Sequence, residues 1–328
     1  MIAGHEKAIG QLRSAWDSRA LHHAWLLAGP RGVGKATFAR AAAERILAEA
    51  AGPPFEAPAL DTPADHRIAK LIAAGSHPDM RWLARLEHEK TGNLARNITV
   101  KQVRELGEFL GLTPALSEWR AIVIDSIDDL EPSAANALLK MLEEPPPHTV
   151  FLLVSHAPGR LLPTIRSRTR RLDFSALGDE AMTSVLEAQV PEMSDSERRK
   201  LVALAGGSAG RALAFASLDL AALEKNALAI LREGDLDNSR RSALASELAR
   251  KAAADRYAAF LQLLPGLVAQ EARTAGEPQR GRALNAYEQV RELVAIAPRL
   301  SLDPAATVFQ LGGILASVAE AATSPGRP

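Results

Sequence analysis

The sequence predicts an α/β protein with a mostly parallel sheet, followed by a helical C-terminal part. Short apolar runs alternate with helical patterns over the first half, which is typical of parallel strands joined by helices. A glycine-rich loop, Gly29–Lys35, lies between the first apolar run and a helical segment. Alanine is abundant (62 residues, 31 of them after position 200) and aromatic residues are 4%, so close-packed helices are expected in the C-terminal third.

Composition restricts the class of protein. A chain of 328 residues should hold two or three domains. Its 39 lysines and arginines balance 39 aspartates and glutamates, so no global charge draws it to nucleic acid or membrane. Cysteine is absent, which excludes disulfides, thiol catalysis and cysteine-ligated metal sites. The longest apolar runs, such as 149–154, are too short to span a membrane, so a cytoplasmic protein without a membrane partner is expected.

The first elements follow from periodicity. Residues 6–20 carry apolar residues at helical spacing, 24–28 are a short apolar run, and 35–50 are an alanine-rich helical pattern. Residues 51–65 hold four prolines with little periodicity and are predicted to be a loop. The order strand, glycine loop, helix is therefore expected near the N-terminus.

Two further strands and two helices are expected before residue 156. Thr99 and Gln102 form a possible capping box at the start of the first of these helices. The second helix should end at three consecutive prolines. The expected elements are the helix 103–110, the strand 121–125, the helix 132–144 and the strand 149–155.

The character of the sequence changes at about Ser175. No strand is convincing beyond it, and Ser194 with Glu197 makes another possible capping box. Beyond about residue 218 the pattern is helical to near Glu320. The chain is therefore expected to have an α/β part followed by helical parts.

The glycine loop has the pattern of a phosphate-binding loop. Glycines let backbone N–H groups surround a phosphate, the helix N-terminus adds partial positive charge, and the lysine reaches the outer phosphates. A glycine turn with an incidental lysine is the alternative. The residues expected to bind nucleotide here are Gly29, Pro30, Arg31, Gly32, Val33, Gly34, Lys35, Ala36 and Thr37.

At two positions the residue differs from the one that a nucleotide-hydrolysing site requires. Ala36 stands where a Ser or Thr hydroxyl would hold Mg²⁺, and Thr37 is rotated from that position by about 100° on a helix. Asp125 ends the second strand and is a plausible Walker B aspartate, but Ser126 follows it where a glutamate would orient water. Asp128 is expected in the turn beyond the strand tip. Hydrolysis is therefore expected to be disabled.

The chain resembles the clamp-loader AAA+ ATPases of bacterial DNA polymerase III over about residues 1–215. The motifs that carry this are GPRGVGK, IVIDSIDDL (122–130), NALLKMLEEPP (136–146), FLLVS (151–155) and TIRSRT (164–169). The resemblance implies an AAA+ P-loop domain over 1–174, a small helical lid over 175–218, and a helical C-terminal domain over 219–328. In the family that last domain joins its counterparts in a collar.

The resemblance also implies roles for single residues. Arg168 would be an arginine finger that acts on ATP held by a neighbouring subunit. Arg211 matches a sensor 2 arginine that contacts nucleotide in its own subunit, and Ser155 with His156 occupies the sensor 1 region. Without the family, the arginines from Arg160 to Arg171 would be a solvated basic strand edge, Arg211 a helix-surface residue, and His156 an ordinary half-buried histidine.

No metal site is expected. The zinc module of the family normally has four cysteines, and this chain has none. The possible replacement ligands His66, His77 and Asp79 lack the paired spacing of a structural zinc site. His22 and His23 are adjacent and are expected to point in different directions.

These observations predict a non-hydrolysing, stator-like subunit of a clamp loader, with no activity of its own within the polymerase III holoenzyme. ATP is expected to bind weakly or not at all. The expected partners are other loader subunits, a sliding clamp and primer–template DNA. The alternatives are an ATP-hydrolysing AAA+ motor, which Ala36 and Ser126 oppose, and a small-molecule P-loop kinase, which leaves TIRSRT and the helical third unexplained.

Overall fold

The computed structural model forms two compact units and describes residues 2–52, 54–87, 94–218 and 220–319. The first unit contains Met1–Ala188 and Gly206–Gly210, and the second contains Gln189–Ala205 and Arg211–Pro328. The segment predicted to be a lid, 175–218, contributes to both units. The three-part division itself stays a prediction.

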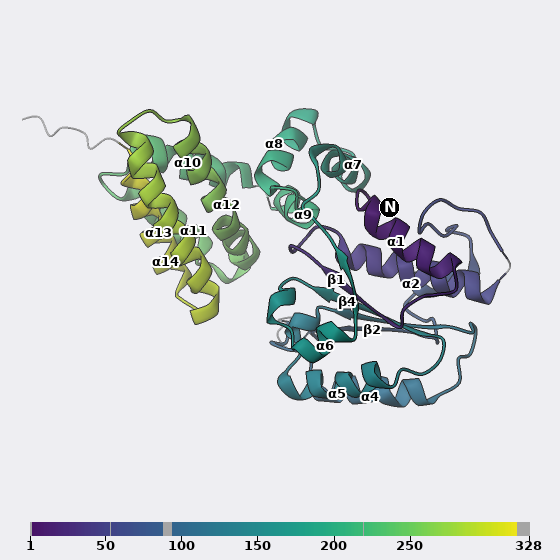
Figure 1. The fold of residues 1–328 in the computed structure, drawn as a ribbon. Helices are drawn as coiled ribbons and strands as arrows, with labels where there is room; N and C mark the ends of the chain where they lie inside the picture. The colour runs from purple at the N-terminus through teal and green to yellow at the C-terminus, as the bar shows by residue number, and fades with distance from the viewer. Residues whose placement is uncertain (1, 53, 88–93, 219, 320–328) are drawn as a thin grey trace, which may run out of the picture. The chain divides into compact units, whose positions relative to one another are not determined.

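The first unit is built on a five-stranded parallel sheet with the order β2-β3-β4-β1-β5 (Figure 1). This confirms the mostly parallel sheet expected from the alternation of strands and helices. The strands are β1 (Ala24–Ala28), β2 (Met80–Ala84), β3 (Arg120–Asp125), β4 (Thr149–Ser155) and β5 (Arg170–Asp173).

The three inner strands are the three that the sequence predicts. β1 and β4 are buried along their whole length, and β3 is buried except at its last residue, so each is a continuous apolar run. The edge strand β2 has one buried residue, Leu83, and is not predicted from the sequence. In β5 only Leu172 is buried, consistent with a solvated basic strand edge.

Helices cover both faces of the sheet (Figure 1). One apolar cluster joins the sheet to α1 (Glu6–Asp17) and α2 (Lys35–Ala51), and a second joins it to α4 (Val100–Gly111) and α5 (Pro132–Glu143). The capping box at the start of α4 is confirmed, because Thr99 and Gln102 each bond the backbone of the other. The short helix α3 (Arg67–Ala73) is not predicted from the sequence.

The first unit also contains short elements between its strands and one helix after β5. They are η1 (Ile127–Asp129), η2 (Pro158–Arg160), α6 (Pro163–Ser167) and α7 (Asp179–Gln189).

The second unit is helical throughout its described part, as expected. A large apolar cluster fills it, with Phe260 among its fully buried side chains. The Ser194–Glu197 capping box is confirmed by reciprocal hydrogen bonds. Its helices are α8 (Asp195–Ala205), α9 (Ala209–Ser217, which begins in the first unit), α10 (Leu220–Glu233), α11 (Ser239–Leu248), η3 (Lys251–Ala253), α12 (Ala254–Thr274), α13 (Gln279–Leu300) and α14 (Pro304–Ala316).

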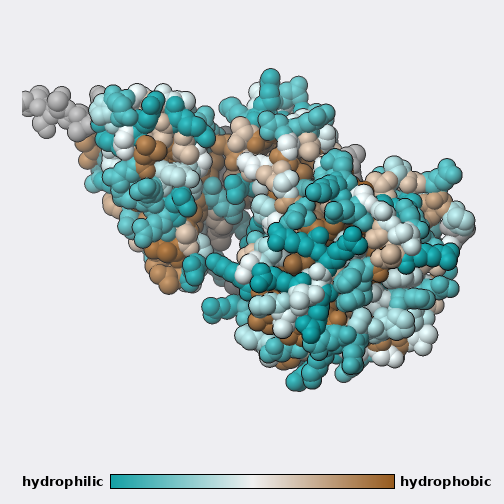
Figure 2. Space-filling view, viewed as in Figure 1, coloured by the Kyte–Doolittle hydropathy of each residue, from teal (hydrophilic) through white to brown (hydrophobic). Residues whose placement is uncertain are grey.

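The surface of the first unit is mainly hydrophilic in the view of Figure 2. In the second unit, apolar colour gathers at the end that lies lowest in this view. The exposed large apolar side chains of this unit include Ile296 and Leu300 on α13 and Phe309 on α14. Among the described residues, no helix is both long and apolar enough to cross a membrane.

Candidate functional site

The glycine loop follows β1 and leads into α2, so the expected order of strand, loop and helix is confirmed. Gly29 must be glycine here, because a Cβ atom would collide with the carbonyl oxygen of Phe174. Gly34 precedes α2 with φ = 98°, a left-handed conformation that glycine adopts without steric cost. The loop backbone is thus shaped by residues that the motif requires.

Lys35 is 2% exposed and bonds the loop itself. Its Nζ donates to the carbonyl oxygen of Gly29 at 2.7 Å and to that of Pro30. Burial lowers the pKa of Lys35 to about 8, and the nearby carboxylates of Asp128 and Asp125 oppose that shift. The lysine is therefore held among groups that compete for the same N–H donors that a phosphate would need.

The segment 206–210 closes over the loop from another part of the first unit. The backbone N–H of Gly210 donates to the carbonyl of Gly32 at 2.8 Å, and the hydroxyl of Ser208 donates to that of Arg31 at 3.2 Å. A Cβ at Gly210 would lie 3.1 Å from the Cα of Gly32, so the close approach favours glycine. Arg211 follows directly, is half-buried on α9, and belongs to the second unit. Its sensor 2 role stays a prediction.

The residues after Lys35 offer little to a metal ion. Ala36 occupies the first turn of α2 and carries only a methyl group. Thr37 is exposed, and one helical step turns it by about 100° from the position of Ala36. Thr37 is the first residue after Lys35 that carries a hydroxyl, and it lies off the required direction.

Asp125 ends β3 beside β4, with Asp125 opposite Val154 and Ala28 of β1 opposite Ser155. The parallel register thus brings Asp125 to the carboxyl end of the sheet, where the loop also begins. Burial raises the pKa of Asp125, and the positive charge of Lys35 opposes this. Ser126, next along, is 2% exposed, and its Oγ bonds nothing within the described part of the chain. No carboxylate replaces the water-orienting glutamate at this position.

Asp128 is a site residue that the sequence interpretation underestimates. It lies in η1, the expected turn, but its carboxylate accepts hydrogen bonds from the Ser155 hydroxyl at 2.9 Å and from the backbone N–H groups of His156 (2.5 Å) and Ala157 (3.2 Å). It also acts electrostatically on Lys35. Sequence spacing alone could not reveal this, since the partners are about 27 residues away along the chain.

His156 is half-buried, as expected, and faces the positive charges of the loop. Burial, followed by the charges of Lys35 and Arg31, lowers the pKa of His156 to about 4. The imidazole is therefore neutral near pH 7. A sensor role for this position stays a prediction.

His5 also touches the glycine loop and has no signal in the sequence. Its Nε2 lies 2.8 Å from the carbonyl oxygen of Val33, and its ring lies 4.7 Å from that of Phe174. The contact joins the start of α1 to the loop across 28 residues. It becomes visible only when the two segments are brought together.

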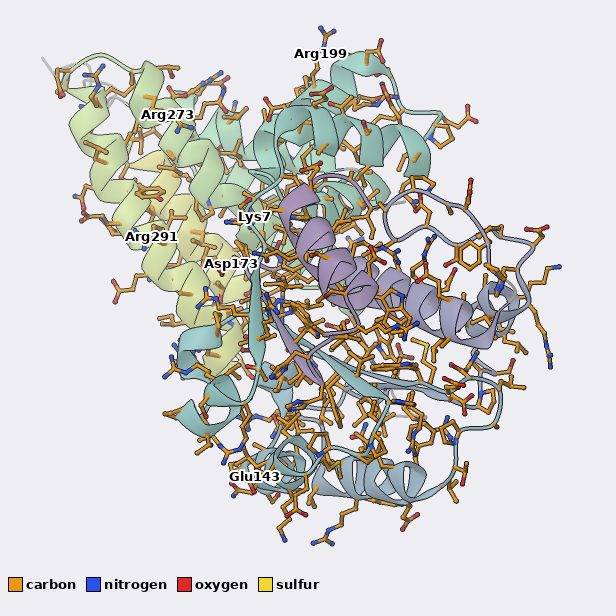
Figure 3. All side chains as sticks on the ribbon, turned by 45° about the vertical axis from the view of Figure 1, so that its right-hand side comes forward. Lys7, Glu143, Asp173, Arg199, Arg273 and Arg291 are labelled. Atoms are coloured by element: carbon orange, nitrogen blue, oxygen red, sulfur yellow. The ribbon has the colours of Figure 1, made fainter. Side chains whose placement is uncertain are left out.

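Arg168 lies at the C-terminal cap of α6, with 34% of its side chain exposed. Its Nη2 pairs with Oε1 of Glu143 at 2.8 Å, and its Nη1 donates to the carbonyl of Thr164 at 3.0 Å. Glu143, labelled in Figure 3, is the last residue of α5. Within the described residues, the polar contacts of Arg168 go to α5 and α6 and not to the glycine loop.

The residues considered as metal ligands have local structural roles. The His66 side chain caps α3 by accepting from the backbone N–H of Ile68, and His77 accepts from that of Asp79 at 3.1 Å. The carboxylate of Asp79 accepts three backbone N–H groups, from Ala115, Leu116 and Ser117. In the part of the chain that the structure describes, no three His, Asp or Glu side chains gather to hold a metal ion.

One expectation about histidines is wrong. The rings of His22 and His23 do not point apart but stack, with centroids 4.3 Å apart and an interplanar angle of 29°. The stacking places the two rings side by side just before β1.

A parallel sheet whose first strand runs through a glycine loop into a helix, with a lysine and an aspartate at the carboxyl ends of the strands, defines a P-loop α/β protein. The chain belongs to the family described as DNA polymerase III, delta subunit, whose model matches residues 4–178. This match confirms the resemblance drawn from the motifs.

Curated relatives agree with the family. The chain is 39% identical to DNA polymerase III subunit delta' of Pseudomonas aeruginosa over 201 residues, which are 60% of this chain and 57% of that protein. It is 32% identical to subunit delta' of Haemophilus influenzae over 52% of this chain and 48% of that one. The matches thus span about half the length of these relatives.

The chain is also similar to other DNA polymerase III subunits and to solved structures. Subunit tau of Bacillus subtilis is 28% identical over 65% of this chain and 36% of its own. A gamma subunit-related protein from Thermotoga maritima aligns with 93% of this chain and 98% of its own, with 19% identity and a TM-score of 0.46.

Proposed function

We propose that the chain is a non-hydrolysing subunit of the DNA polymerase III clamp loader. In this role it helps load a sliding clamp onto primed DNA and presents Arg168 to ATP held by a neighbouring subunit. One observation carries the proposal. The loop keeps its glycines and Lys35, while Ala36 and Ser126 stand at the two positions that hydrolysis requires. The subunit names of the relatives support the assignment to this complex.

Loss of both the magnesium ligand and the water-orienting carboxylate would leave the site unable to hydrolyse ATP. A hydroxyl after the lysine would hold Mg²⁺, which neutralises charge that develops on the transferring phosphate. A carboxylate after Asp125 would orient the attacking water. Ala36 cannot coordinate a metal ion, and the buried hydroxyl of Ser126 is a poor proton acceptor. Each change alone would slow turnover, and together they favour a scaffold over a motor.

Weak nucleotide binding follows from the contacts of Lys35. A phosphate would have to displace the carbonyl oxygens of Gly29 and Pro30 from its ammonium group. Without a metal ligand at Ala36, magnesium would add little to the affinity. ATP is therefore expected to bind weakly, and magnesium is expected to change that binding little.

The arginine finger rests on the placement of Arg168. A guanidinium keeps its charge at working pH and donates in a fixed fork, so it can meet the charge on a phosphate. The short helix α6 presents Arg168 at the protein surface, and its polar contacts among the described residues do not involve the glycine loop of the same chain. This arrangement suits action on a second subunit better than action within the chain.

Assembly is assigned to the helical second unit. The side chain of Leu300 is 67% exposed, and Ile296, Leu284 and Phe309 are exposed as well. Apolar groups on helices gain free energy when a partner buries them. We therefore assign the collar contact with other loader subunits to this unit, which leaves the sheet unit to present Arg168 next to a neighbour's ATP.

The test uses loaders reconstituted with wild-type, Arg168→Ala, Arg168→Lys or Arg166→Ala chain. All should assemble equally. Arg168→Ala should strongly lower DNA-stimulated ATP turnover and clamp loading; arginine fingers contribute about 10³–10⁵ in rate in well-studied GTPases. Arg168→Lys should rescue little, because a point charge lacks the fork. Arg166→Ala, an exposed change on the same helix, should behave as wild type.

Equal turnover of the Arg168→Ala and wild-type loaders would remove the finger from the proposal. The motor alternative has its own readout, the release of phosphate by the isolated chain. Turnover there at an ordinary enzymatic rate, lost in Lys35→Ala, would replace the scaffold with a motor.

A further inference from the structure

The guanidinium of Arg168 is held by two different elements. Within its own helix it donates from Nη1 to the carbonyl of Thr164 at 3.0 Å, with Ser167 Oγ at 3.5 Å. From the neighbouring helix α5, Glu143 accepts from Nη2 at 2.8 Å. The two anchors meet the guanidinium on separate nitrogens and so restrict both its position and its rotation.

This restraint reduces the freedom of the Arg168 side chain. The side chain has four rotatable bonds, and an exposed arginine with no partner samples many rotamers. With 34% of Arg168 and 46% of Glu143 exposed, solvent screens the pair, so its worth to folding stability is small. Its effect on geometry is larger, because a charged acceptor at 2.8 Å selects one side-chain direction.

The anchors leave part of the guanidinium able to bind something else. A guanidinium has five N–H donors. The contacts with Glu143, Thr164 and Ser167 engage Nη1 and one N–H of Nη2. Among the described residues, Nε–H and the second N–H of Nη2 have no hydrogen-bond partner, so they can still donate to a phosphate oxygen.

We propose that Glu143 is a positioning residue, which holds Arg168 in the direction from which it reaches a neighbour's phosphate. The inference rests on the proposed function, since it gives Glu143 a purpose only if Arg168 acts in trans. Glu143 itself does not touch the phosphate. It fixes the guanidinium in advance, so that less side-chain freedom is lost when the neighbouring ATP is engaged.

Glu144 provides a matched control beside it. It follows Glu143 at the C-terminal cap of α5, is exposed, and makes no ion pair among the described residues. Glu143→Gln and Glu144→Gln therefore remove the same charge from the same surface. Only the first removes the charged acceptor from Arg168.

The experiment measures DNA-stimulated ATP turnover of reconstituted loaders that carry Glu143→Gln, Glu144→Gln, Arg168→Ala or the Glu143→Gln/Arg168→Ala pair. Glu143→Gln should lower kcat by about tenfold and leave KM for ATP unchanged. Tenfold is the lower end of the loss seen when a residue that orients a metal ligand is replaced. Glu144→Gln should match wild type. In the Arg168→Ala background, Glu143→Gln should cause no further loss.

The outcomes separate this inference from the function on which it rests. If Arg168→Ala lowers turnover but Glu143→Gln does not, the finger stands and the positioning role is wrong. If Glu143→Gln lowers turnover equally with and without Arg168, it acts by another route and the role is again wrong. If Arg168→Ala has no effect, the arginine finger is removed from the proposed function and the positioning role of Glu143 is wrong as well.

A second variant guards against a folding defect. Glu143→Asp keeps the charge but shortens the side chain by one methylene, so it should reach Arg168 less well and give a kcat between those of wild type and Glu143→Gln. If Glu143→Gln does not assemble, this variant carries the comparison with Glu144→Asp. Equal kcat for these two variants would overturn the positioning role.

Discussion

The carboxylate of Asp128 accepts a hydrogen bond from the hydroxyl of Ser155 at 2.9 Å and so ties the turn after β3 to the end of β4. The same carboxylate accepts the backbone N–H groups of His156 and Ala157. These contacts fix the segment that faces Lys35. Asp128 therefore supports the shape of the sheet's carboxyl end next to the glycine loop.

Asp128→Ala should destabilise the chain by about 1–3 kcal/mol, because it leaves partly buried N–H donors without an acceptor. Urea unfolding of the full chain measures this as a lower midpoint. Asp129→Ala is the control, since Asp129 pairs with the partly exposed Arg85 at 3.2 Å and should cost about 0–1 kcal/mol. Equal losses for the two variants would contradict the role of Asp128.

Stability should fall in acid through His156. Its pKa is lowered to about 4 in the folded chain, while an unfolded histidine titrates near 6.5. Between these values the unfolded state binds more protons, so stability rises with pH from about 4 to about 6.5 and is lost as pH falls through that window. Melting temperatures at pH 7.5 and pH 4.5 should differ less in His156→Gln than in wild type. An identical drop in both would show that His156 protonates freely in the folded state.

Restoring the missing hydroxyl should restore the response to magnesium. Wild-type chain should bind ATP weakly, with affinity almost unchanged by Mg²⁺, whereas Ala36→Thr should gain about tenfold in affinity when Mg²⁺ is present. Turnover should stay at background in both, because Ser126 remains. Isothermal titration with and without Mg²⁺ measures the difference, and Lys35→Ala controls for binding at the loop. A wild-type affinity that already depends strongly on Mg²⁺ would contradict the account of Ala36.

Leu300→Glu should prevent assembly without unfolding the chain. Because the side chain is exposed, the stability of the isolated protein should change by no more than about 0.5 kcal/mol. A buried carboxylate in a subunit contact would be costly, so the variant should fail to co-purify with the other loader subunits. Leu236→Glu, also highly exposed in the second unit, should still assemble. Assembly of both variants would place the collar contact elsewhere.

The central strands were predictable and the edges less so, for one physical reason. β1, β3 and β4 are covered on both faces, which requires continuous apolar runs that periodicity detects. Arg81 and Trp82 of β2 are exposed, so this strand has no such run. It becomes a strand because its backbone pairs with β3, from Met80 opposite Ala121 to Ala84 opposite Asp125.

The same division holds at the site. The glycine loop is encoded locally, since its glycines and Lys35 lie within one short stretch. His5 and Asp128 reach the site only through contacts across 27 or more residues. Glu143 meets Arg168 because the ends of α5 and α6 lie together.

By itself, the sequence determined the family, the buried strands, the helical C-terminal part, and the two replacements at Ala36 and Ser126. These are properties of residue type and local spacing, which the chain carries before it folds. Only the tertiary structure decided which side chains surround the loop, that Lys35 bonds its own loop carbonyls, and that Glu143 holds Arg168. Those contacts depend on the parallel register of the sheet and the packing of helices on it, because folding alone brings distant segments within hydrogen-bond distance.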